Sequence, residues 1–202
     1  MATFRSELRS ISATPSLTPK QAREALLQQA QGGDVSAADD LFDLTLSLED
    51  DVDLHFDYVV EIPTTVLPRL VAERPDDLLL LVERVGGHLD NNFGTRDFNW
   101  VNRPLGWMLD VARAAEAAGD VDLLEDVSVV LLDQNAGWDR YRQYRPLRQW
   151  LSSLAEPAQH AVAAALRRDS RACAWLSETV EVQVDERPIL YAALQAGAAG
   201  AN

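Results

Sequence analysis

The residue types that most often perform catalysis or bind metals are few in this sequence and widely separated. The three histidines, His55, His88 and His160, share no local motif. His55 is flanked by Asp53 and Asp57, and two carboxylates beside an imidazole could bind a metal ion or orient the ring. A hydrated acidic surface explains the same pattern without a ligand, so we predict no metal site at His55.

The remaining candidates for chemistry are also incomplete. The run LEDDVD (48–53) could hold a hard cation, but such runs are usually hydrated. The segment DNNFG (90–94) lacks the third and fifth Asp and the final Glu of a calcium loop, and Cys173 is typical of a small buried residue. No dinucleotide-binding, phosphate-binding, nucleophile-elbow or zinc-protease motif is present. The sequence therefore predicts no catalytic residue, no metal ligand and no cofactor, and a protein that is not an enzyme.

One segment has the composition of a recognition surface. WDRYRQYRPLRQW (138–150) is the densest run of arginine and aromatic residues in the chain. These residue types dominate the hot spots of protein interfaces. However, aromatic residues before a helix also fold back onto the core, and arginines beside aspartates form ordinary surface ion pairs. The run therefore predicts either a binding surface or a helix start with large packed side chains.

Composition and charge limit the possible partners. The chain has 202 residues, which suits one domain, and its net charge is −14 with a pI of about 4.5. Such a chain repels phosphate backbones, so we do not expect nucleic acid binding, and it favours encounter with basic partners. No apolar run is long enough to span a membrane, and no N-terminal apolar segment resembles a secretion signal. Together with the single cysteine, these features predict a cytoplasmic protein.

Evenly spaced prolines divide the sequence into repeats. Pro104, Pro146 and Pro188 recur at a spacing of 42 residues, each preceded by Arg, and Pro63 and Pro19 extend the series backwards. Proline suits the first position of a helix. Apolar residues follow the last three prolines at the spacing of an amphipathic helix. Each of these prolines is therefore expected to begin a helix.

A second series of helix starts is expected between these prolines. Four pairs precede an apolar segment: Gly33-Asp34, Pro75-Asp76, Gly119-Asp120 and Glu156-Pro157. Proline fits the start of a helix there, and Asp can cap it. The second helices include DLLLLVERV (77–85) and VDLLEDVSVVLL (121–132), which are apolar around most of their circumference. We expect these helices to be buried between their neighbours.

A pair of helices every 42 residues or so resembles the HEAT/armadillo class of α-solenoid, over residues 18–198. The resemblance implies an all-α, right-handed solenoid of about four to five helix-hairpin repeats. Residues 1–17 are then an N-terminal extension, and residues 18–202 form a single α-helical repeat domain. RPILYAALQAG (187–197) is similar to the opening of an ankyrin repeat, but ankyrin units are shorter than this period. A non-repetitive helical bundle is the remaining alternative.

Stacked repeats would align the segments before each proline along one edge of the molecule. The linker 88–103 and the segment 138–146 bring aromatic residues and arginines to this edge. Trp107 and Trp150 are expected in the core, because they lie within the predicted helices. We predict that the edge, or an adjoining concave face, binds a protein. The predicted binding residues are Asp97, Phe98, Trp100, Arg103, Trp138, Tyr141, Arg142, Tyr144, Arg145 and Arg148.

Two functional hypotheses follow. The preferred one is a non-enzymatic interaction module for a basic protein, of which an immunity or antitoxin protein that neutralises a basic toxin is one form. The alternative comes from the resemblance, since some HEAT-like solenoids are alkylpurine DNA glycosylases that use aromatic residues and a carboxylate on a concave face. Trp100 with Asp97, and Trp138 with Asp139, could imitate that arrangement. The overall negative charge argues against this alternative.

The predicted edge can be tested by replacing Arg142 and Tyr144 together with alanine. The double variant is expected to lose partner binding and to keep its helix content, measured by circular dichroism. Loss of helix content would instead place these two residues in the core.

Overall fold

The described part of the chain is helical. The computed structural model describes residues 19–47, 62–91, 98–138, 145–169, 171–172 and 188–200. Its elements are α2 (Pro19–Gln31), α3 (Val35–Ser47), the 3-10 turn η1 (Thr64–Val66), α5 (Leu67–Glu73), α6 (Pro75–Asn91), α7 (Phe98–Ala118), α8 (Val121–Trp138), α9 (Arg145–Leu151), α10 (Glu156–Arg168) and α12 (Pro188–Gly200). No strand occurs in these ranges, which confirms the all-α prediction for them.

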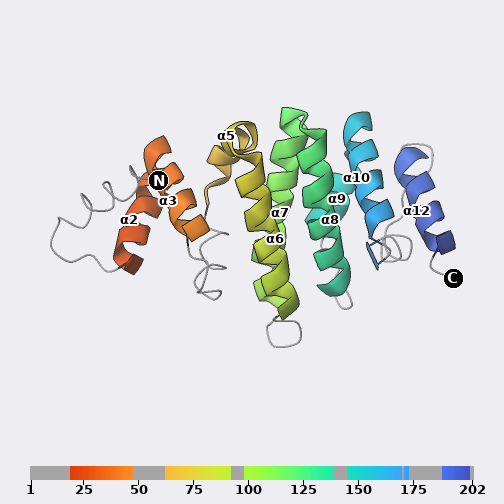
Figure 1. Ribbon diagram of the computed structural model, residues 1–202, viewed down its shortest axis with the longest axis horizontal. Coiled ribbons are helices and arrows are strands. Elements are labelled where there is room, and N and C mark those ends of the chain that lie inside the picture. The colour runs from red at the N-terminus through yellow and green to blue at the C-terminus, as the bar shows by residue number, and fades with distance from the viewer. Residues whose placement is uncertain are drawn as a thin grey trace.

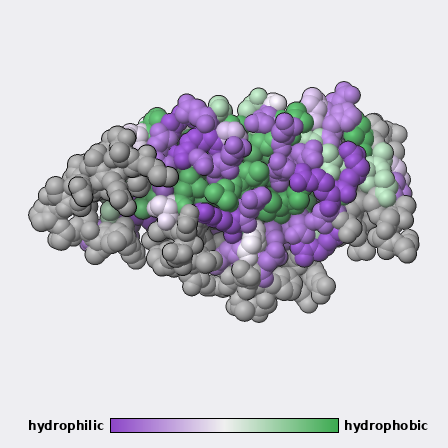
Figure 2. Space-filling view, in the orientation of Figure 1, coloured by the Kyte–Doolittle hydropathy of each residue, from purple (hydrophilic) through white to green (hydrophobic). Residues whose placement is uncertain are grey.

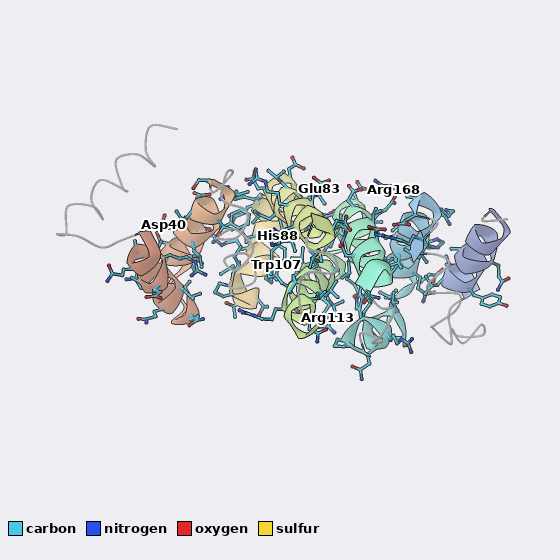
Figure 3. All side chains as sticks on the ribbon, turned by 90° about the horizontal axis from the view of Figure 1, so that it is seen from below. Asp40, Glu83, His88, Trp107, Arg113 and Arg168 are labelled. Carbon is cyan, nitrogen blue, oxygen red and sulfur yellow. The ribbon has the colours of Figure 1, made fainter. Side chains whose placement is uncertain are left out.

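The helices lie side by side along the long axis of the molecule in nearly the order of the chain (Figure 1). Seen along the perpendicular view of Figure 3, they form two layers. We call α6, α8 and α10 the front layer, because they face the viewer in Figure 1, and α5, α7 and α9 the back layer. Within the layers, α6 packs on α8, α8 packs on α10, and α5 packs on α7. Each of these contacts joins successive helix pairs, while α7 and α8 pack together within one pair.

Two turns between paired helices share one motif. Gly33 and Gly119 have φ values of 94° and 72°, which a residue with a Cβ atom adopts only with strain. The following residues, Asp34 and Asp120, each donate their backbone N–H to the carbonyl five residues earlier, at 3.0 Å. Their carboxylates then accept backbone N–H groups of the next helix, at 2.9 Å for Asp34 and 3.1 Å for Asp120. These Gly-Asp pairs therefore end one helix and begin the next, as the sequence predicts.

The prediction for Pro104 is wrong. Pro146 and Pro188 lie in the first turns of α9 and α12 as expected, but α7 begins at Phe98 and contains Pro104 in its interior. Residues 88–91 belong to α6 and residues 98–103 to α7, so the segment 88–103 is not a long linker. The cause is tertiary packing: Val101 is buried four residues before Leu105 on the same helical stripe, and its burial extends the helix past the proline. Pro104 lacks an N–H group, so the carbonyl four residues earlier loses its helical donor.

One hydrophobic core runs through the described helices, from Phe42 on α3 to Leu190 on α12. Trp107 and Trp150 are buried, with 4% and 3% of their surface exposed, which confirms their predicted place in the core. The indole Nε1 of Trp150 donates to Glu116 on α7 at 2.7 Å, and this bond joins successive back-layer helices. The core is therefore shared between neighbouring pairs.

The contact between α6 and α8 depends on a glycine. A Cβ atom at Gly86 would lie 2.6 Å from Cγ1 of Val130, whereas a Cβ atom at Gly87 would meet nothing within 4 Å. Gly86→Ala is expected to lower the free energy of unfolding by about 1–3 kcal/mol through overpacking. Gly87→Ala is expected to raise it by about 0.5–1 kcal/mol, because alanine favours the helix. Urea unfolding followed by circular dichroism measures both changes, and equal effects of the two substitutions would contradict the close approach of α6 and α8.

Candidate interaction surfaces

The ten predicted binding residues fall into two groups. Four lie outside the described residues: Asp97, Tyr141, Arg142 and Tyr144. The others lie on helices and not in loops: Phe98, Trp100 and Arg103 in α7, Trp138 at the end of α8, and Arg145 and Arg148 in α9. Side chains are described for Arg103, which is exposed, and Arg148, which is half-buried. The structure therefore corrects the predicted loop setting of five residues, whereas Arg148 lies in a helix as predicted. The proposed edge stays a prediction.

Arg148 has an unusual environment for an arginine. Its Nε and Nη2 atoms are buried, and neither has a hydrogen-bond partner in the described part of the chain. Burying a guanidinium N–H without an acceptor is unfavourable by about 1–3 kcal/mol. An acceptor supplied to α9 from elsewhere would relieve this penalty, so Arg148 keeps its place among the candidate binding residues.

The other residues considered for chemistry are not brought together. His88 is buried between the layers, near Trp107 in Figure 3, whereas His160 is exposed on α10. His55, Cys173 and the run 48–53 lie outside the described residues. Among the side chains that are described, no group of three or more His, Cys, Asp or Glu residues is placed to hold a metal ion.

Two arginines connect the first helix pair, α2 and α3, to the second pair, α5 and α6. Arg69 on α5 forms a bidentate ion pair with Asp39 on α3. Arg74, between α5 and α6, binds Asp43 on α3, and its guanidinium lies 4.6 Å from the ring centre of Phe42. The hydrogen bond from Asp39 raises the pKa of Arg69, so this guanidinium stays charged. These charges therefore stabilise packing between helices.

Two further arginines attach α10 to α8. Arg168 donates to Asp126 at 2.6 Å and to Glu125 at 3.2 Å. Arg171, just after α10, donates from Nε to Asp133 at 2.7 Å. Arg168 and Asp126 are 42 residues apart, which equals the spacing of Pro104, Pro146 and Pro188. The same kind of link thus recurs at two separate boundaries between helix pairs.

Burial, a neighbouring carboxylate and an arginine all affect the pKa of Asp133. Burial raises the pKa of its carboxyl group, and a hydrogen bond with Asp169 raises it further, whereas Arg171 lowers it. The net effect is a pKa above the ordinary value of 3.8, because desolvation and the neighbouring carboxylate both disfavour the charged form. The end of α8 therefore holds a carboxyl group that binds its proton more tightly in the folded protein.

The outward side of the front layer carries exposed apolar side chains. Figure 2 shows hydrophobic surface across the middle of this side, with hydrophilic residues above and below it. Leu80 on α6 is 39% exposed, and Leu79, Val129 and Val130 are half-buried. We call these four residues and Gly87 the apolar stripe. Complete burial of the second helices is therefore a wrong expectation for Leu80, whose neighbours Leu78 and Leu81 are fully buried.

Carboxylates surround the apolar stripe. They are Asp76, Glu83 and Asp90 on α6, and Asp122, Glu125, Asp126 and Asp133 on α8. The described side chains include 19 carboxylates and 10 arginines, so the described part of the chain is acidic like the whole sequence. The sequence contains one sign of this exposed apolar surface. Segment 77–85 has more apolar residues than one buried helical stripe requires.

Comparison with known proteins identifies no relative: no family model, no curated protein and no solved structure matches this chain. In the parts of the chain described above, no helix combines the length and apolar character needed to cross a membrane.

The raised pKa of Asp133 predicts a defined pH dependence. In the folded state this group holds its proton to higher pH than in the unfolded chain. Its stabilising contribution is therefore complete below the unfolded pKa of about 3.8 and is lost as the pH rises through the folded value. Asp133→Asn cannot titrate, so its stability relative to the wild type is expected to rise with pH.

Urea unfolding at several pH values between acid and neutral conditions measures this trend. Asp110→Asn on α7 is the matched control for removing one carboxylate, because Asp110 is also half-buried and also forms an ion pair, with Arg113. A relative stability of Asp133→Asn that falls with pH would mean that the ion pair with Arg171 outweighs burial.

Proposed function

We propose that this chain is a non-enzymatic helical-repeat protein that binds a basic protein partner. The architecture in this proposal is a right-handed, HEAT-like α-solenoid of four to five helix pairs. Helix pairs that follow one another along the long axis support it, as do the Gly-Asp turns and the arginine links between successive pairs. Stacked pairs of this kind present an extended surface, and binding is the usual role of such surfaces.

The observation that carries the proposal is the distribution of charge. Arg69, Arg74, Arg168 and Arg171 are each paired with carboxylates of a neighbouring helix. Asp76, Glu83, Asp90 and Asp122 are not among the carboxylates of these pairs, so they keep the front layer acidic near the apolar stripe. A basic partner would be steered to such a surface, because complementary charge accelerates encounter. An immunity or antitoxin protein that neutralises a basic toxin is the specific form we favour.

A nucleic-acid enzyme similar to the alkylpurine DNA glycosylases has less support. It requires a basic track for the phosphate backbone. Arg167, Arg168 and Arg171 are close in sequence and could contribute to such a track, but Arg168 and Arg171 are bound to carboxylates of α8. This alternative predicts affinity for DNA or RNA at low salt that weakens as salt is added, and absence of any such affinity would remove it.

The proposed function predicts a stoichiometric complex in the cells that produce this protein. Chemical cross-linking followed by affinity purification and native mass spectrometry is expected to recover one basic protein. The complex should dissociate as the salt concentration rises, because the attraction between the two charged surfaces is screened.

The matched variant is Asp76→Asn with Glu83→Gln, which removes two exposed carboxylates beside the apolar stripe. We expect slower association of the recovered partner with this variant and little change in the dissociation rate. Recovery of no stoichiometric partner, or of one whose association is insensitive to both salt and these substitutions, would contradict the proposed function.

A further inference from the structure

We infer that the partner docks on the apolar stripe of the front layer, and that its docking element is a single amphipathic helix with lysine or arginine on both flanks. This inference rests on the proposed function and adds to it the surface and the chemistry of the partner.

The shape of the stripe suits an elongated apolar element. Leu80 and Gly87 are seven residues apart on α6, so they lie on the same side of the helix two turns apart. One residue before Gly87, α6 and α8 approach closely: a Cβ atom at Gly86 would lie 2.6 Å from Cγ1 of Val130. No side chain projects at Gly87, and a Cβ atom there would meet nothing within 4 Å. The surface therefore has no projecting side chain at Gly87, on the same side of α6 as Leu80.

Leu79 and Val130 of the stripe pack against the core, whereas Leu80 and Val129 do not. Leu78, Leu81 and Val82 are fully buried, whereas Leu80, between them in sequence, is 39% exposed. Val129 is half-buried and is not among the side chains that pack against the core. Apolar surface that is surrounded by charged residues is typical of an interaction site.

The charges around the stripe specify a cationic partner. Glu83 points outward from α6 in Figure 3, and Asp76 and Asp90 are exposed on the same helix. Among the nearby arginines, Arg84 donates to the carbonyl of Leu46 on α3, and Arg168 is bound to α8. Asp76 and Glu83 are four residues before and three residues after Leu80, so they lie on the same side of α6 as Leu80. A helix that contacts Leu80 through an apolar residue would therefore also meet carboxylates, which favours basic residues next to its apolar side.

Other occupants fit less well. A second copy of this chain would place acidic borders against each other, and like charges across an interface are strongly unfavourable. A membrane surface presents anionic headgroups, which the same carboxylates would repel. An extended strand would need an unpaired sheet edge, and the stripe is made of helices whose backbone groups are already bonded.

A synthetic peptide tests the inference directly. The probe is an amphipathic leucine–lysine helix of about 18 residues, or five turns, and the reference is a peptide of the same composition in permuted order. The full-length protein is expected to bind the amphipathic peptide at least about tenfold more tightly than the permuted one. Equal affinities would mean that charge alone is recognised, and would overturn the inference.

Leu80→Glu separates docking on the stripe from general attraction. It adds a negative charge to an exposed position, so pure electrostatic attraction predicts tighter binding of the cationic peptide. Docking predicts binding weaker by about tenfold or more, because a charge replaces an apolar contact. Gly87→Gln, which fills the low point without adding charge, is expected to weaken binding as well. Tighter or unchanged binding by both variants would overturn the inference.

The control for added charge is Gln149→Glu, at an exposed position of α9 in the back layer. It is expected to bind the peptide as tightly as the wild type or slightly more tightly. Circular dichroism of each variant verifies that its helix content is retained. A concentration-dependent dimer of the wild type that Leu80→Glu abolishes would identify a second copy as the occupant and overturn the inference.

The natural partner, once recovered, distinguishes this inference from the proposed function. If it binds Leu80→Glu with undiminished affinity but fails to bind Arg142→Ala with Tyr144→Ala, then the proposed function stands and the docking surface is the edge. If it loses affinity for Leu80→Glu and binds Gln149→Glu normally, the inference is supported.

Discussion

The structure depends on apolar burial between successive helix pairs. A helix that packs only against the other helix of its own pair would leave part of its apolar surface in water. Here Leu81 and Val85 of α6 are fully buried, and so are Val127 and Leu131 of α8. The close approach of α6 and α8 at Gly86 makes this burial possible in the front layer. The pairs formed by α5 to α8 are therefore stabilised by packing between pairs as well as by packing within each pair.

Electrostatic links are added to this packing in a consistent direction. At the two boundaries where the structure describes them, arginines of the later pair reach carboxylates of the earlier pair. Exposed pairs of this kind contribute little each, about 0.2–1 kcal/mol. Their larger effect is on the surface, because the paired arginines no longer offer a continuous positive track. An acidic chain with arginines placed between its helices remains acidic where a partner would approach.

Local chemistry in the sequence predicts the helix pairs well. Asp34 and Asp120 cap helices where expected, and Trp107 and Trp150 are in the core. Pro104 is different, because the burial of Val101 in the tertiary structure extends α7 beyond the local preference of proline. The exposure of Leu80 could not be predicted either. Hydrophobicity alone does not say how much of a helix its neighbours cover, and Leu78, Leu80 and Leu81 are identical in type.

The candidate site, like the fold, could be predicted only in part from the sequence. Sequence composition predicts an interaction protein and a basic partner, and it points to an edge rich in arginine and aromatic residues. The apolar stripe combines residues of two helices that are far apart in the sequence, so it is visible only once α6 and α8 are placed side by side. Of the predicted edge residues with described side chains, Arg148 has two buried guanidinium nitrogens without a partner, which no sequence pattern indicates.

The attachment of the first helix pair has a consequence for how the protein comes apart. α2 and α3 pack closely on each other, and Arg69, Arg74 and Arg84 connect α3 to the helices that follow. Ion pairs at the surface are screened by salt, whereas the apolar contacts among α6, α8 and α10 are not. Because Phe42 of α3 also lies in the shared apolar core, added salt weakens the ionic part of this attachment and leaves its apolar part in place.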